Sequence, residues 1–249
     1  MFNLFKNNRQ AIISMTDIGD RDVNQDSHES MSVVQHHLLC SADGLGGHEA
    51  GELASQILCQ KIREIFSPQM QNEMNKDQFS QLIQQALDNT NHTLKSHPKA
   101  SAAHTTMALA WIDNDQVLTA HVGDSRVMAI SPKSGRLWRT RDHSVVQMLV
   151  DHGEVDEQDM GTHSEQGKLT KSISAEKQVE ASIKQYPSLN KGEILLTCTD
   201  GFWEHINLDE LKKLAQKPSK KHLQKLVELS KKRATPNSDN ITVQIFVKI

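Results

Sequence analysis

Five aspartates lie in settings where their carboxylates could hold a metal ion. Asp43 and Asp200 each end a short apolar run and are followed directly by glycine, which is typical of an acid at the mouth of a buried strand. Asp26, Asp124 and Asp239 lie in polar, turn-like segments without periodicity. Carboxylate oxygens without a histidine and cysteine cluster are the ligands that Mg²⁺ and Mn²⁺ prefer, whereas Zn²⁺ favours histidine and cysteine.

The glycines that follow Asp43 suit a tight turn beside a bound ion. Gly44, Gly46 and Gly47 allow backbone conformations that are closed to other residues, and they let a carbonyl approach whatever Asp43 binds. The alternative for an isolated Asp-Gly pair is an ordinary turn before a helix. The recurrence of the same strand and Asp-Gly pattern at Asp200 favours the metal interpretation.

Apolar spacing predicts the elements that must position these acids. We expect strands at about residues 10–17, 33–42, 107–113, 116–122, 126–131, 137–140, 193–198 and 241–247, and helices at about 49–66, 77–94, 145–152, 208–216 and 220–233. The short turns between consecutive strands require antiparallel neighbours, which excludes a doubly wound parallel sheet as the main plan. Helix pairs on either side of a strand meander predict an α+β fold with two packed sheets covered by helices on both outer faces.

The segment from about 144 to 190 differs from the rest of the chain. It is polar and irregular apart from the short helix, and we expect a mobile surface flap there. No stretch of the sequence has the composition of a linker between domains. We therefore expect residues 1–249 to form one catalytic domain that includes this flap.

Composition narrows the range of partners and compartments. The chain has 249 residues, a mass of 28.0 kDa and a formal net charge of -3, which gives no electrostatic case for binding nucleic acid or an anionic membrane. Cys40, Cys59 and Cys198 lie in apolar positions and form an odd set, which is typical of reduced thiols in a cytoplasmic protein. The segment from Met1 to Arg9 has no long apolar run and predicts no secretory or membrane segment. We expect a monomer.

Two ions held by carboxylates can activate water for the hydrolysis of a phosphate ester. Rival chemistries lack their motifs. Thiol phosphatases need an arginine at a fixed short distance after the nucleophile, and Gly46, Ile65 and Glu204 stand at that distance from the three cysteines. The sequence also has neither a Gly-Lys-Ser/Thr phosphate loop nor a Gly-x-Ser-x-Gly elbow.

Several short motifs occur together in one order along the chain. They are Arg21-x-x-Asn24-Gln25-Asp26, Asp43-Gly44-Leu45-Gly46-Gly47-His48, Gly123-Asp124-Ser125-Arg126, Asp142-His143-Ser144, Thr199-Asp200-Gly201 and Asp239-Asn240-Ile241-Thr242. In these motifs, from about residue 11 to 247, the chain resembles the metal-dependent serine/threonine protein phosphatases of type 2C (the PPM family), in their compact bacterial form. The resemblance implies a four-layer α/β/β/α sandwich with a binuclear Mn²⁺ or Mg²⁺ centre. It also implies dephosphorylation of phosphoserine and phosphothreonine in phosphorylated proteins, opposing a cognate serine/threonine kinase in bacterial signalling.

The resemblance also assigns roles to single residues. Asp43 matches the carboxylate that bridges both metals, and the Gly44 carbonyl matches a ligand of one of them. Asp200 and Asp239 match ligands of the other metal, and Asp26 matches an acid that serves the second metal directly or through water. The sequence departs from the animal members at Leu45, where those carry a histidine proposed as the general acid.

Two further residues have roles by resemblance and plain structural alternatives. Arg21 matches the arginine that receives the substrate phosphate, and its alternative is an ion pair with Asp20 or Asp22. Asp124 matches the acid that helps to hold a third, weaker ion, and its alternative is a simple Gly-Asp-Ser turn. For Asp26 the alternative is a capping or turn role. Asp142 and His143 are expected to stabilise the entry to the flap and are left outside the catalytic set.

Two functions outside ordinary catalysis remain as alternatives. One is a catalytically weak phosphoprotein-binding regulator, a pseudophosphatase, which would be expected to have lost at least one of the core acids. The other is a non-enzymatic regulator that binds a partner through the flap. Retention of the acids favours the enzyme.

Overall fold

The structure is a computed structural model that describes residues 12–46, 48–100 and 102–248. Residues 1–11, 47, 101 and 249 lie outside the described part. The expectations for the N-terminal segment, for the first two residues of the first predicted strand and for Gly47 therefore fall outside it.

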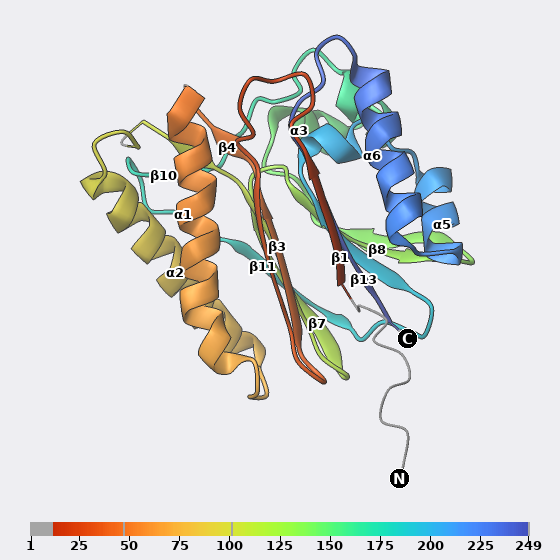
Figure 1. Cartoon of the computed structure of the whole chain (residues 1–249), viewed down its shortest axis with the longest axis horizontal. Coiled ribbons are helices and arrows are strands. Elements are labelled where there is room, and N and C mark those ends of the chain that lie inside the picture. Colours follow the sequence, from red (N-terminus) through yellow and green to blue (C-terminus); the bar gives the residue numbers. More distant parts are fainter. Residues whose placement is uncertain (1–11, 47, 101, 249) are drawn as a thin grey trace.

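Two five-stranded antiparallel sheets lie between two pairs of helices (Figure 1). The first sheet has the order β11-β7-β6-β3-β2, and the second has the order β1-β13-β12-β8-β9. The strands of the first sheet are β2 (Ser27–Ser32), β3 (His37–Ala42), β6 (Met107–Ile112), β7 (Gln116–Val122) and β11 (Ser182–Pro187). Those of the second are β1 (Ile12–Asp17), β8 (Arg126–Ser131), β9 (Gly135–Arg139), β12 (Ile194–Cys198) and β13 (Ile241–Val247).

The helix pairs form the two outer layers. Helices α1 (His48–Phe66) and α2 (Lys76–Ser96) cover the first sheet, and α5 (Leu208–Gln216) and α6 (Lys220–Ala234) cover the second (Figure 1). The short helices α3 (Val145–Asp151) and α4 (Asp200–Trp203) complete the described α-helices. The predicted α+β class and its four layers are confirmed. None of the described helices has the length and apolar character needed to cross a membrane.

Apolar side chains fill each of the three spaces between the layers. Trp111 and Phe79 are fully buried between the first sheet and its helices, and Phe202 is buried between the second sheet and its helices. Leu39 and Leu195 meet between the two sheets, where small alanines on β6 and β8 allow close packing. Burial of such side chains is the main favourable term in folding, and it fixes the two sheets face to face.

Three parts of the first sheet and its surroundings differ from the sequence expectation. Strand β2 lies in the predicted polar loop, and β11 lies in the predicted irregular flap, where it pairs in register with β7. Both are edge strands of the sheet, and polar side chains in each obscure the apolar alternation that would predict a strand. A third, small sheet is formed by β4 (Gly44–Leu45), β5 (His104–Thr105) and β10 (Ile173–Ser174), which are too short for periodicity to reveal.

Candidate metal centre

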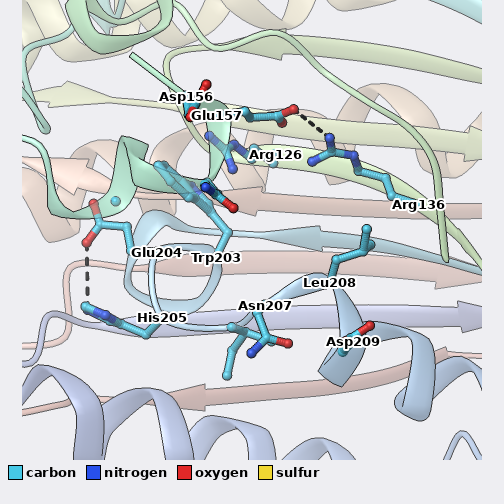
Figure 2. Close-up of a pocket in the computed structure, with 13 residues that line it drawn as sticks. Arg126, Arg136, Asp156, Glu157, Trp203, Glu204, His205, Asn207, Leu208 and Asp209 are labelled. Carbon is cyan, nitrogen blue, oxygen red and sulfur yellow. Dashed lines mark hydrogen bonds and ion pairs between the residues drawn. The ribbon is translucent and has the colours of Figure 1, made fainter. Parts of the chain in front are cut away.

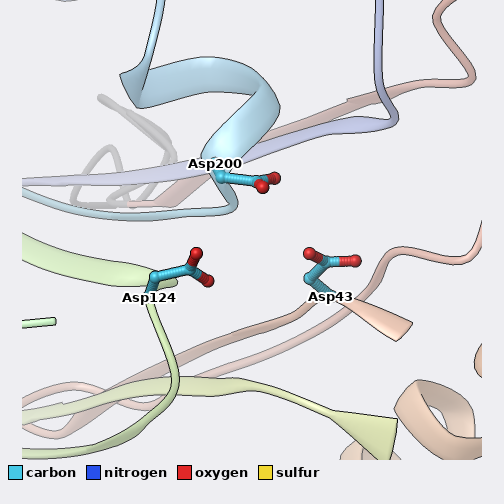
Figure 3. A group of neighbouring side chains, drawn as sticks. All are labelled: Asp43, Asp124 and Asp200. Carbon is cyan, nitrogen blue, oxygen red and sulfur yellow. The ribbon is translucent and has the colours of Figure 1, made fainter. Parts of the chain in front are cut away.

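Three of the five aspartates converge at one end of the sandwich. Ligand atoms of Asp43, Asp124 and Asp200 all lie within 4.8 Å of one another, and their carboxylates face a common space (Figure 3). Strands β3 and β7 both run antiparallel to β6 and therefore point the same way. Asp43 and Asp124, which follow them, lie at the same end of the first sheet. Asp200 begins α4 directly after β12 of the second sheet. Asp43 and Asp200, the two strand-end acids of the sequence analysis, therefore lie close together, and Asp124 joins them from a turn.

Asp239 lies beside this group and is paired with Arg21. Arg21 Nη2 lies 3.0 Å from Asp239 Oδ2, and the two side chains are 55% and 43% exposed. The alternative pairing of Arg21 with Asp20 or Asp22 is not the one observed, since Asp20 Oδ2 instead accepts the backbone N–H of Ser238 at 3.0 Å. Arg21 thus stands at the exposed rim of the acidic group, next to one of its members.

Asp26 is a buried acid in the loop between β1 and β2. Its Oδ2 accepts a hydrogen bond from the Thr199 hydroxyl at 2.8 Å, and among the described residues its buried Oδ1 has no hydrogen-bond partner. Burial raises the pKa of Asp26 to about 8, and the nearby carboxylates of Asp200 and Asp239 add to the rise. The turn role belongs to Asn24, whose Oδ1 accepts the N–H of Asp26 at 3.2 Å. Asn24 rather than Asp26 therefore makes the turn contact, and the Asp26 carboxylate lies near those of Asp200 and Asp239.

Gly44 is required by the close approach of neighbouring backbone. A Cβ atom at this position would lie 2.1 Å from the carbonyl oxygen of Gly51 and 2.6 Å from that of Gln25. Any side chain would push α1 and the loop before β2 away from Asp43. The glycine requirement predicted here is thus steric, whereas Gly46, with φ +135, needs glycine for its backbone conformation.

The carboxylates of this acidic group are buried close to one another, so a bound cation would stabilise their ionised forms. Burial first, and then the charges of Asp200, Asp26, Asp124 and Asp239, raise the pKa of Asp43 well above its usual range. Burial and then the charges of Asp200 and Asp142 raise the pKa of Asp124, and burial and the charge of Asp239 raise the pKa of Asp200 to about 7. Like charges this close cannot all remain ionised without compensation. The convergent donors are oxygen atoms alone, so they fit hard divalent ions such as Mg²⁺ and Mn²⁺.

The loop that carries Asp124 is held by residues that the sequence analysis left outside the catalytic set. The backbone N–H of His143 donates to the Gly123 carbonyl at 2.9 Å, and the His143 Nδ1 atom accepts the Gly123 N–H at 3.1 Å. Asp142 forms a buried ion pair with Arg126, whose Nη2 lies 2.6 Å from Asp142 Oδ2. These contacts hold the loop that carries Asp124, and the expected role of both residues at the entry to the flap stays a prediction.

A cavity of about 790 Å³ lies beside α4 (Figure 2). Arg126 lines it with its guanidinium 3.3 Å from the centroid of the Trp203 ring, and Glu204 lines it near His205, with 3.8 Å between Oε2 and Nε2. Burial, followed by the charge of Asp200, raises the pKa of Glu204 to about 9. The sequence analysis did not identify Glu204 as a candidate site residue, because its raised pKa depends on its burial in the folded chain.

The chain is similar in sequence to known protein phosphatases. The model of the family described as protein phosphatase 2C matches residues 16–240. The serine/threonine phosphatase stp of Listeria monocytogenes serotype 4b is 26% identical over 212 residues, which cover 83% of this chain and 82% of that protein. The serine/threonine protein phosphatase PstP of Mycobacterium tuberculosis is 24% identical over 231 residues, which cover 91% of this chain and 43% of that protein.

Solved structures agree with this result. The serine/threonine phosphatase of S. agalactiae superposes with a TM-score of 0.79 at 26% identity and covers 95% of this chain and 98% of its own. The serine/threonine phosphatase Stp1 from Staphylococcus aureus gives a TM-score of 0.81 at 26% identity, with 95% and 94% covered. Because the family model spans most of the sequence and the fold agrees, the chain belongs to the protein phosphatase 2C family, as a bacterial type of that family.

Proposed function

We propose that this chain hydrolyses phosphoserine and phosphothreonine in phosphorylated proteins at a centre of two divalent cations, Mn²⁺ or Mg²⁺. The observation that carries the proposal is the convergence of Asp43, Asp124 and Asp200 within 4.8 Å in a family of protein phosphatases. A structure of the PstP catalytic domain, related in fold, is in complex with two manganese ions. The water adds to phosphorus as the bond to the side-chain oxygen breaks, which yields free hydroxyl and inorganic phosphate.

The acids and one backbone carbonyl would provide the ligands of the two ions. Asp43 would bridge both ions, the Gly44 carbonyl would complete one, and Asp200 and Asp239 would complete the other. Asp26 would serve the second ion directly or through water, and its buried Oδ1, which has no hydrogen-bond partner in the described part of the chain, supports that role. When bound, the ions supply an activated water and neutralise phosphoryl charge.

Two residues would act around this pair of ions. Arg21 would receive the substrate phosphate, since its half-exposed guanidinium stands at the rim beside Asp239 and a planar fork suits phosphate oxygens. Asp124 would help to hold a third, weaker ion, because its carboxylate is buried and faces those of Asp43 and Asp200.

A thiol nucleophile is disfavoured by the surroundings of the cysteines. Cys40, Cys59 and Cys198 are free and buried, and burial raises the pKa of the Cys198 thiol far above its usual range. A thiol must ionise to attack phosphorus. The free thiols also support our proposal of a cytoplasmic location, where we place the enzyme as a monomer opposing a serine/threonine kinase.

The test is phosphate release from three peptides of one sequence that carry phosphoserine, phosphothreonine or phosphotyrosine. We expect purified protein with Mn²⁺ to hydrolyse the first two and to leave the third largely intact, and we expect the Asp43→Asn variant to be inactive on all three. A folded wild-type protein without activity on phosphoserine or phosphothreonine would contradict the proposal and favour a phosphoprotein-binding regulator.

A further inference from the structure

Thr106 lies between β5 and β6 and has no exposed surface. Its backbone N–H donates to the carbonyl of Asp43 at 2.9 Å, and its hydroxyl oxygen accepts the backbone N–H of Asp43 at 2.9 Å. A single residue therefore holds both polar main-chain groups of Asp43.

The same side chain also contacts both neighbours of Asp124. The hydroxyl oxygen of Thr106 lies 2.7 Å from the hydroxyl oxygen of Ser125, which is itself fully buried. On the other side of Asp124, Gly123 has φ +91, and a Cβ atom there would lie 2.6 Å from the Thr106 methyl carbon. Thr106 thus fills the space between the loops that present Asp43 and Asp124.

The hydroxyl of Thr106 has little freedom to bond elsewhere. It has one hydrogen and two lone pairs, and one lone pair is occupied by the N–H of Asp43. Its bond to Ser125 joins the two loops whichever oxygen donates. Thr105 differs, because its hydroxyl donates to the Asp43 carbonyl at 2.8 Å and the described contacts do not extend it to Ser125.

Two carboxylates this close repel each other, so their separation must be imposed by the surrounding structure. We propose that Thr106 is a positioning residue that fixes the spacing of Asp43 and Asp124 through its hydroxyl bridge to Ser125, and thereby sets the affinity for divalent cations. This inference rests on the proposed metal centre. Thr106 itself touches neither an ion nor the substrate.

The test compares matched threonine variants by calorimetric titration with Mn²⁺ and by turnover of a phosphothreonine peptide. Thr106→Val keeps the methyl group and removes the bridge, whereas Thr106→Ser keeps the hydroxyl. Thr90→Val is the control, because Thr90 is also fully buried and loses one hydroxyl bond, of 2.7 Å, to Ala86 within α2. We expect Thr106→Val to weaken Mn²⁺ binding by roughly 10- to 100-fold, the usual effect of removing a residue that orients a metal ligand. Thr106→Ser and Thr90→Val should remain near the wild-type affinity.

A double-mutant cycle with Ser125→Ala tests the bridge itself. We expect the Thr106→Val and Ser125→Ala double variant to bind Mn²⁺ no more weakly than Thr106→Val alone, because both changes remove the same link. Additive losses would contradict the bridge. Ser125→Ala, with its smaller change in packing, provides the test if Thr106→Val does not fold, and it should then weaken Mn²⁺ binding by itself.

The outcomes separate this inference from the proposed function. If wild-type protein binds Mn²⁺ and is active, and Thr106→Val binds it as tightly as Thr90→Val does, the positioning role is wrong and the metal centre stands. If folded wild-type protein binds no Mn²⁺, the proposed function is wrong and this inference falls with it.

Discussion

Arg21 and Asp239 are 218 residues apart in the sequence, yet Arg21 Nη2 lies 3.0 Å from Asp239 Oδ2. The sequence singled out both residues but did not pair them. The predicted alternatives for Arg21 were its near neighbours, because sequence distance was the only guide to an ion partner. The pair forms because β1 and β13 lie side by side and bring the loop after β1 against the residues that precede β13.

The role of Arg21 can be tested by substitution. Arg21→Ala should weaken binding of a phosphothreonine peptide by roughly 1.5–3 kcal/mol, the scale of a hydrogen bond to a charged group, and should leave Mn²⁺ affinity nearly unchanged. Arg21→Lys is the control, since it keeps the charge and loses the planar fork. Steady-state kinetics and calorimetry measure the two effects. Unchanged KM in Arg21→Ala would return Arg21 to a purely structural ion pair.

Substitution of Asp239 distinguishes a role as a metal ligand from a role in the turn before β13. Asp239 Oδ1 accepts the N–H of Asn240 at 2.8 Å, which asparagine could also do. Asp239→Asn should therefore fold, yet kcat should fall by at least roughly a hundredfold, because one ion is held less tightly. The matched control is Asp113→Asn, since Asp113 Oδ1 accepts the N–H groups of Asp115 and Gln116, each at 2.8 Å, in a turn before β7. Wild-type turnover in Asp239→Asn would refute its role as a ligand.

At the scale of elements, a stacked histidine pair joins β7 to the start of the segment 144–190. The rings of His121 and His143 are 4.5 Å apart and 5° from parallel, and His143 Nε2 lies 2.8 Å from the Ser182 hydroxyl of β11. Burial, then the charges of His121 and Lys171, lower the pKa of His143 to about 3. Burial likewise lowers the pKa of His121.

These shifts predict a loss of stability in acid. The unfolded chain binds a proton on His143 below about pH 6.5, while the folded chain does so only near pH 3, so the free energy of unfolding falls across that window as pH falls. Urea unfolding at pH 7, 6 and 5 should show a shallower decline for His143→Gln than for wild type. The control His92→Gln, on an exposed side chain of α2, should decline as wild type does. Equal slopes for all three proteins would contradict the prediction.

The segment 144–190 is more structured than its sequence indicates. Its last part forms β11, whose residues pair with β7 from Ser182 to Pro187, so the part proposed to be mobile narrows to the residues before it. Backbone amides of residues 153–168 should exchange with deuterium faster than those of β12, because they lie in turns and in the short 3-10 helix Glu157–Thr162, where most side chains are not buried. Hydrogen exchange followed by mass spectrometry measures this. Exchange in 153–168 as slow as in β12 would contradict a mobile flap.

The central strands and the edge strands β1 and β9 of the second sheet were predictable, but the edge strands β2 and β11 of the first sheet were not. β6, β8 and β12 are buried along their whole length and appear in the sequence as apolar runs. β2 and β11 have mixed exposure and polar side chains, and only their hydrogen-bonded neighbours reveal them. The same limit applies to Thr106, whose contacts with Asp43 and Ser125 exist only after the sheets have packed.

At the scale of the whole molecule, the candidate centre belongs to the assembly of layers. Asp43 and Asp124 follow strands of the first sheet, and Asp200 and Asp239 adjoin strands of the second. The sequence singled out these acids because Asp43 and Asp200 end apolar runs and the others lie in recognisable motifs, whereas the distances between them appear only in the folded chain. The depth of Asp26 and the raised pKa of Glu204 could not be predicted, because burial depends on how the layers pack.

The central claim is that catalysis depends on divalent cations held by these aspartates. The most direct measurement follows hydrolysis of a phosphothreonine peptide after chelation and during titration with Mn²⁺, with bound Mn²⁺ measured in parallel by calorimetry. We predict that chelation abolishes activity and that Mn²⁺ or Mg²⁺ restores it in step with binding, because the donor set is composed of oxygen atoms. Full activity of the wild-type protein in excess chelator would contradict the account.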